Sequence, residues 1–166
     1  MKKSLWLPIM MLFPLLCPPG IQAQSFDLKP DQKELFNRYL KGTFKSELAK
    51  DTFHIFEARP YGPGYDCNFW YQANGVNYQE GRSLIGYDQK LDKFIQVELY
   101  KDGNIDLFAL WFSSNNLCKC VPLDYLDNPD KAPMKFELEY LSPDECTFTF
   151  IKHNKPDKIV TYYRVK

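Results

Sequence analysis

The sequence predicts an all-β protein: a single antiparallel up-and-down barrel of about eight to ten strands, with one short N-terminal helix capping one end. Three observations lead to this prediction. After residue 42, apolar and polar residues alternate with a period of two, as in half-buried strands. Turn signals interrupt the alternation about every ten residues. Aromatic residues make up 16% of the 166 residues, which favours β-structure.

The N-terminus has the layout of a secretory signal peptide. Two lysines precede an apolar stretch, and Ala23 supplies a small residue at the expected cleavage point. The apolar stretch is about 12 residues long, whereas a membrane-spanning helix needs roughly 20. We therefore expect a signal peptide at 1–23, a folded domain at 24–166, and a secreted or periplasmic protein without a transmembrane segment in its mature chain. The alternative is lipid attachment at Cys17, although Leu16 stands where lipoprotein signals prefer a small residue.

One helix is predicted at about 30–40. Pro30 suits a first helical turn, and Asp31 places negative charge near the positive end of the helix dipole. Four apolar residues then share one face: Leu35, Phe36, Tyr39 and Leu40. Gly42 ends the helix.

Ten strands are predicted after this helix. Their expected ranges are 43–49, 52–60, 65–73, 76–87, 93–101, 104–113, 117–122, 133–141, 145–153 and 158–165. Asn-Gly at 74–75 and Asp-Gly at 102–103 are hairpin signals, and Pro143 and Pro156 begin turns. Residues 123–132 indicate a longer loop.

Consecutive hairpins leave two architectures, a closed barrel or a sandwich. The single helix favours the barrel, because it covers one open end. The strand at 93–101 supports this choice, because two different faces alternate along it. One face carries Ile95, Val97 and Leu99, and the other carries Phe94, Gln96, Glu98 and Tyr100. A mixed aromatic and polar face suits a barrel interior with a wet cavity. The alternative is an amphipathic outer surface.

Four cysteines remain after removal of the signal peptide. They are Cys67, Cys118, Cys120 and Cys146. In an oxidising compartment this even number predicts at least one disulfide, with three full pairings open. We expect Cys118 and Cys120 to meet different partners rather than each other. Free, buried cysteines are the alternative.

The segment from Tyr39 to Ser46 resembles the start of the calycins, the lipocalin and fatty-acid-binding superfamily. In that family a short helix runs into a Gly-x-Trp motif, which corresponds here to Gly42-Thr43-Phe44, with phenylalanine in place of tryptophan. The resemblance implies that Arg164, near the end of the last strand, packs over the Phe44 ring and closes the barrel. Residues 86–88 and 93–95 also resemble an uncharacterised group of secreted bacterial lipocalin-like proteins.

Motifs for catalysis or metal binding are not apparent. The chain has 21 basic and 21 acidic residues, and this balance argues against binding to nucleic acid. His153 is a candidate axial ligand for haem, and a buried carboxylate among Glu57, Glu98 and Asp106 is a candidate general acid. These carboxylates are equally able to pair with Arg59 or Arg82. We expect no catalytic residues, no metal site and no cofactor.

The function that needs the fewest assumptions is the binding of one small apolar or amphipathic molecule inside the barrel. The candidate wall residues are Phe69, Trp70, Tyr71, Tyr78, Phe94, Tyr100 and Trp111, with Arg82, Gln96 and Glu98 as polar contacts. A binding protein is expected to turn Trp70 or Trp111 toward a cavity of roughly 300 Å³ or more. The competing interpretation is a structural or interaction module with a filled barrel.

Overall fold

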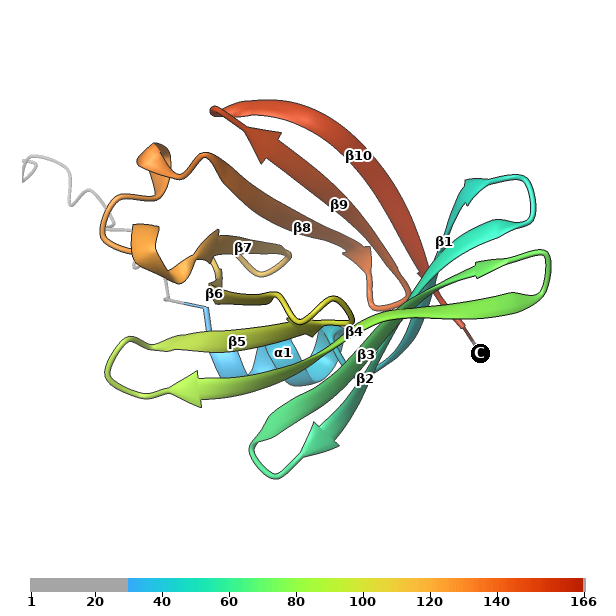
Figure 1. The fold of residues 1–166 in the computed structure, drawn as a ribbon. Helices are drawn as coiled ribbons and strands as arrows, with labels where there is room; N and C mark the ends of the chain where they lie inside the picture. The colour runs from blue at the N-terminus through green and yellow to red at the C-terminus, as the bar shows by residue number, and fades with distance from the viewer. Residues whose placement is uncertain (1–29, 166) are drawn as a thin grey trace, which may run out of the picture.

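The computed structural model describes residues 30–165 and shows a closed antiparallel barrel with one short helix (Figure 1). Each strand pairs with its neighbours in the sequence, and the first strand pairs with the last. The strands are β1 (Gly42–Ala49), β2 (Thr52–Tyr61), β3 (Gly64–Ala73), β4 (Val76–Asp88), β5 (Lys93–Tyr100), β6 (Ile105–Phe112), β7 (Leu117–Pro122), β8 (Met134–Ser142), β9 (Glu145–Lys152) and β10 (Lys155–Arg164). The predicted fold class is confirmed. The signal peptide at 1–23 and Cys17 lie outside the described residues.

The period-two alternation separates the inside of the barrel from its outside. On β5, Phe94 and Gln96 are buried inside, whereas Val97 and Leu99 are exposed outside. The mixed aromatic and polar face therefore points inward, as the sequence predicts. The predicted loop at 123–132 contains two short 3-10 turns, Leu123–Tyr125 and Pro129–Lys131.

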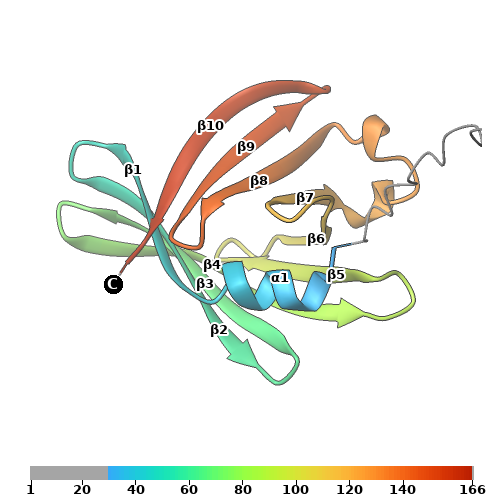
Figure 2. The same ribbon diagram turned by 180° about the vertical axis from the view of Figure 1, so that it is seen from behind.

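Helix α1 (Gln32–Tyr39) lies across one end of the barrel (Figure 2). Asp31 caps it by accepting a hydrogen bond from the backbone N–H of Glu34 at 2.9 Å. Its apolar face enters the barrel, where the Phe36 ring stacks on Phe94 with 3.8 Å between ring centroids. The buried Gln32 side chain donates to the Phe112 carbonyl at 3.0 Å and accepts from the Phe112 N–H at 2.7 Å. This end of the barrel is therefore closed and packed.

The seam between β1 and β10 closes the barrel. Only two residue pairs form its register, Phe44 with Arg164 and Lys45 with Tyr163. The Arg164 guanidinium lies 4.5 Å from the centroid of the Phe44 ring. Gly42, at φ +120°, leaves no room for a Cβ beside that guanidinium.

The four cysteines of the barrel are free and buried, so the predicted disulfide is absent. Cys118 and Cys120 share the inner face of β7, because residues two apart on a strand point to the same side. Cys146 is on β9, two strands away, and strands are about 4.8 Å apart, so the Cα atoms are too far apart to be bridged. Cys67 lies on β3, further around the barrel.

Candidate functional site

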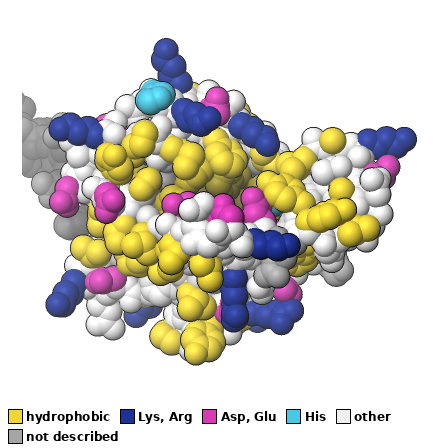
Figure 3. Space-filling model, in the orientation of Figure 1, with side chains coloured by type: hydrophobic (Ala, Val, Ile, Leu, Met, Phe, Trp, Pro, Cys, Tyr) yellow, Lys and Arg dark blue, Asp and Glu magenta, His cyan; other side chains and the backbone are white. Residues whose placement is uncertain are grey.

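The interior opposite the helix is hollow. A cavity of about 370 Å³ occupies this half of the barrel. The space-filling view shows it as a hollow surrounded by hydrophobic side chains, with acidic side chains along one edge (Figure 3). A volume of this size is in the range of small-molecule sites, which is roughly 300–1,000 Å³.

One wall of the cavity is apolar. Its residues come from β8 and β9 and are Phe136, Leu138, Phe148 and Phe150. The aromatic rings contact one another, with 4.8 Å between the centroids of Phe148 and Phe150. This wall offers a hydrophobic aromatic surface to an apolar molecule.

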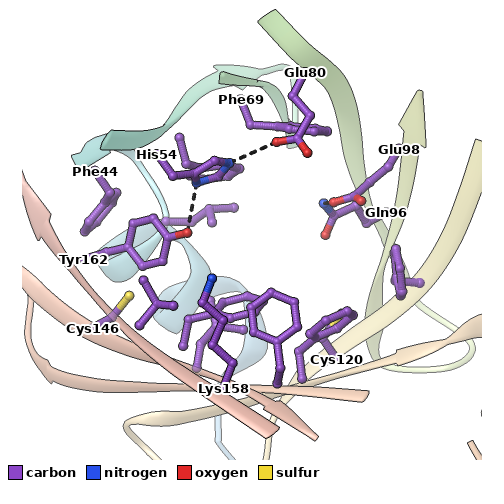
Figure 4. A pocket seen from close by; sticks show the side chains of 18 of the residues that line it. Phe44, His54, Phe69, Glu80, Gln96, Glu98, Cys120, Cys146, Lys158 and Tyr162 are labelled. Atoms are coloured by element: carbon purple, nitrogen blue, oxygen red, sulfur yellow. Dashed lines mark hydrogen bonds and ion pairs between the residues drawn. The ribbon is translucent and has the colours of Figure 1, made fainter. Parts of the chain in front are cut away.

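The facing wall carries the polar groups. They are His54 of β2, Glu80 of β4, Gln96, Glu98 and Tyr100 of β5, and Tyr162 of β10. Figure 4 shows Glu80 and Glu98 directed toward the open centre of the cavity. Phe69 and Tyr71 of β3 complete this side.

A β-bulge aims Glu80 into the cavity. Along the β3–β4 ladder Phe69 pairs with Gly81 and Trp70 pairs with Gln79, so Glu80 is an extra residue without a partner on β3. Bulges re-aim side chains in this way. Gly81, the next residue, leaves space for the Phe69 ring, whose Cζ lies only 2.5 Å from where a Cβ would be.

His54 connects two polar groups of this wall. Its Nδ1 lies 2.9 Å from the Tyr162 hydroxyl, and its Nε2 lies 3.3 Å from Glu80 Oε2 (Figure 4). Burial, together with the nearby charge of Lys158, lowers the pKa of His54 from 6.5 to about 4. The imidazole is therefore neutral at pH 7, so its 3.3 Å contact with Glu80 is not an ion pair.

Glu98 is surrounded by neutral hydrogen-bond donors. Its carboxylate accepts from the Gln96 amide at 2.6 Å and from the Tyr100 hydroxyl at 2.5 Å. Burial raises the pKa of Glu98, and the charges of Asp106 and Glu80 raise it further, against the hydrogen bond from Tyr100. Burial also raises the pKa of Glu80.

Lys158 supplies the positive charge at the mouth. It projects from β10 into the cavity, opposite Glu80 and Glu98 (Figure 4). Its charge acts on His54, whose pKa it lowers.

The structure divides the ten predicted ligand contacts into two halves. Those that line the cavity are Phe69, Tyr71, Gln96, Glu98 and Tyr100. Those that do not are Trp70, Tyr78, Arg82, Phe94 and Trp111. Phe94 is packed beneath the helix, Arg82 forms an outer ion pair with Asp66 at 2.7 Å, and Tyr78 is exposed.

The expectation that a tryptophan faces the cavity is wrong. Trp70 neighbours Phe69 on β3 and Trp111 lies between the buried Leu110 and Phe112, so both point to the opposite side of their strands. His153 is also misplaced as a haem ligand, because it is exposed in the turn between β9 and β10. Glu57 pairs with Arg59 at 2.9 Å on the outer face.

Sequence reasoning missed His54, Glu80, Lys158 and Tyr162 as site residues. Polar residues at inward positions of strands were the available signal for His54 and Tyr162. Glu80 had no such signal, because only the bulge turns it inward.

Comparison with known proteins does not identify a family for this chain. No protein-family model matches the chain, and no curated protein matches it. Within residues 30–165, no helix is long and apolar enough to cross a membrane. In the same range, no three His, Cys, Asp or Glu side chains are grouped so as to hold a metal ion.

Proposed function

We propose that this protein binds one small apolar or amphipathic molecule in the hollow half of its barrel. The observation that supports this most directly is the cavity of about 370 Å³ with an aromatic wall on one side and polar groups on the other. The packed helix end and the Arg164 seam hold the barrel closed without filling this space. The placement of Phe44 and Arg164 also supports a calycin-type protein.

The site of action we propose is a secreted or periplasmic compartment. The support for this lies in the sequence of residues 1–23, with its charged start, apolar stretch and small residue at the cleavage point. N-terminal sequencing of the protein exported by its host is expected to begin at Gln24. An intact Met1 in the mature protein would contradict the proposal.

The binding proposal is tested with a cavity-filling variant and a matched control. Leu138→Trp adds an indole to the cavity wall, whereas Leu84→Trp adds the same group to the outer face, where Leu84 is half exposed. Native mass spectrometry of protein from the host identifies any small molecule that co-purifies. Displacement of a hydrophobic dye by that molecule then measures the affinity of the barrel for it.

We expect Leu138→Trp to lose dye and ligand binding while Leu84→Trp keeps both. Circular dichroism confirms that each variant is folded. Equal binding by the two variants, or no binding of any probe to the unmodified barrel, would refute the proposal.

A second candidate function rests on the outer face of β4 to β6. Five exposed aliphatic residues are adjacent across these strands: Leu84, Val97, Leu99, Ile105 and Leu107. Exposed apolar patches mark interaction surfaces in many proteins. If the protein is an interaction module, we expect it to self-associate or to bind a partner, and Leu99→Lys to abolish this association. Size-exclusion chromatography measures self-association.

A further inference from the structure

The hydrogen-bond donors of His54 and Tyr162 are used within the polar wall. An ionised Glu80 at 3.3 Å favours the tautomer of the neutral His54 ring that carries its proton on Nε2, facing this carboxylate. Its Nδ1 then accepts from the Tyr162 hydroxyl at 2.9 Å. The Tyr162 hydroxyl proton is therefore used, and the His54 N–H faces Glu80.

The same holds on β5. The Gln96 amide nitrogen donates to the Ser83 hydroxyl at 3.3 Å and to Glu98 at 2.6 Å. The Tyr100 hydroxyl donates to the other Glu98 oxygen at 2.5 Å. The donors of these two side chains are therefore also used.

What remains on this wall, apart from the Tyr71 hydroxyl, is a set of acceptors. The unused lone pairs belong to the carboxylates of Glu80 and Glu98, the Gln96 amide oxygen and the Tyr162 phenolic oxygen. Free donors remain on Lys158 at the mouth and on the hydroxyls of Tyr71 and Tyr140. A ligand that satisfies these carboxylates must therefore bring its own N–H or O–H groups.

The charge of the polar wall, which is negative, supports the same conclusion as its hydrogen bonding. Within residues 30–165, neither Glu80 nor Glu98 forms an ion pair with a lysine or an arginine. Buried charges in proteins are normally paired. Lys158 is one positive charge against two negative ones, and it acts on His54 rather than on either carboxylate.

We propose that the ligand of this cavity is an organic cation: a protonated amine that donates hydrogen bonds to Glu80 and Glu98 and carries an apolar body against the aromatic wall around Phe148. Phe69 and Tyr100 flank the polar wall, and their ring faces also attract a cation. This inference rests on the proposed function, because it names the chemical class of the molecule that the cavity holds.

Three probes with the same ten-carbon chain separate charge from hydrophobicity. Decylamine is cationic at pH 7, decanol is neutral and decanoate is anionic, and isothermal titration calorimetry measures each below its aggregation concentration. We expect decylamine to bind at least about tenfold more tightly than decanol, the ratio that one charge-assisted hydrogen bond supplies.

The double variant Glu80→Gln with Glu98→Gln is expected to reduce this ratio to within about threefold, because each amide adds donors and removes a charge. Glu139→Gln, on the exposed outer face of β8, is the matched control and is expected to keep the ratio. Thermal melting verifies that each variant is folded.

The outcomes distinguish this inference from the function on which it rests. Equal binding of the three probes, or a preference for decanoate, would overturn the cation while leaving a binding protein. An amine preference that survives in the double variant would also overturn it. Failure of all three probes to bind the unmodified barrel would overturn the proposed function itself.

Discussion

Replacement of Arg164 by alanine should strongly destabilise the barrel, because this side chain ties several segments to the short β1–β10 seam. Its Nε and Nη2 donate to the Pro143 carbonyl at 3.0 and 2.7 Å, and Nη2 donates to the Tyr39 carbonyl at 3.3 Å. Nη1 donates to the Lys41 carbonyl, and Nε lies 3.0 Å from a carboxylate oxygen of Asp144.

The size of the effect follows from these contacts. A hydrogen bond from a charged group contributes about 1.5–3 kcal/mol, and such contributions at one side chain are not additive. The three carbonyls partly regain water in the variant. We therefore expect Arg164→Ala to lower the free energy of unfolding by about 3–5 kcal/mol. The free energy of unfolding of Arg164→Lys should lie between those of the unmodified protein and of Arg164→Ala, because lysine keeps the charge and lacks the planar guanidinium.

Only part of this loss belongs to the Phe44 ring, and a double-mutant cycle isolates it. The ring lies 4.5 Å from the guanidinium, which corresponds to about 1 kcal/mol for a partly desolvated cation–aromatic contact. Arg164→Ala should therefore cost about 1 kcal/mol less in a Phe44→Leu background than in the unmodified chain. Urea unfolding with an unchanged m-value measures both losses. A coupling energy within about 0.3 kcal/mol of zero would refute the role of the ring in the seam.

Three further predictions concern stability and thiol chemistry. As pH falls from 7 to 4, His54 becomes protonated near pH 6.5 in the unfolded chain but only near pH 4 in the folded chain. Protonation therefore favours the unfolded chain, and this group should reduce the free energy of unfolding by up to about 3 kcal/mol. The raised pKa values of the cavity carboxyls change the free energy of unfolding in the opposite direction, so the effect of His54 is isolated by comparison with His54→Gln. Parallel curves of unfolding free energy against pH for the two proteins would contradict the prediction. Gly64→Ala should cost about 1–3 kcal/mol, because its Cβ would collide with the Ile85 carbonyl, whereas Gly86→Ala has open space and should not be destabilised; similar urea midpoints would count against this packing. The four barrel thiols should be unreactive toward Ellman's reagent in the folded protein and react fully in denaturant, and fewer than four after unfolding without reductant would show a disulfide.

The fold was predictable because its signals are local. Hairpin turns such as Asp102-Gly103 and the period-two alternation each depend on a few neighbouring residues, and pairing in sequence order follows from them. The helix signal at Pro30 and Asp31 is local in the same way. Closure between β1 and β10 is not local, but a ten-strand sheet of hairpins has few other ways to hide its edges.

The site was only half predictable because it depends on register. Residues chosen for aromatic character, such as Trp70 and Trp111, fell on the outer face, since composition does not say which side of a strand points inward. Glu80 depends on a bulge whose position no turn signal marks. Lys158 and His54 come together from strands that are a hundred residues apart in the sequence. The disulfide prediction failed because an even number of cysteines carries no information about their distances.

The distribution of polar groups inside the barrel differs between the packed helix end, which stabilises the fold, and the open half, which stabilises it less. The helix end is filled by contacts such as Phe36 on Phe94, and the seam is held by Arg164. The open half instead holds a largely buried carboxylate and a partly buried one, both with raised pKa values, and an imidazole whose pKa is lowered, so their environment disfavours the charged form of each group. Apolar side chains there would stabilise the barrel more. Groups with such perturbed pKa values, gathered at one cavity, are characteristic of functional sites, and this supports the proposal that binding takes place in the open half rather than at the packed end.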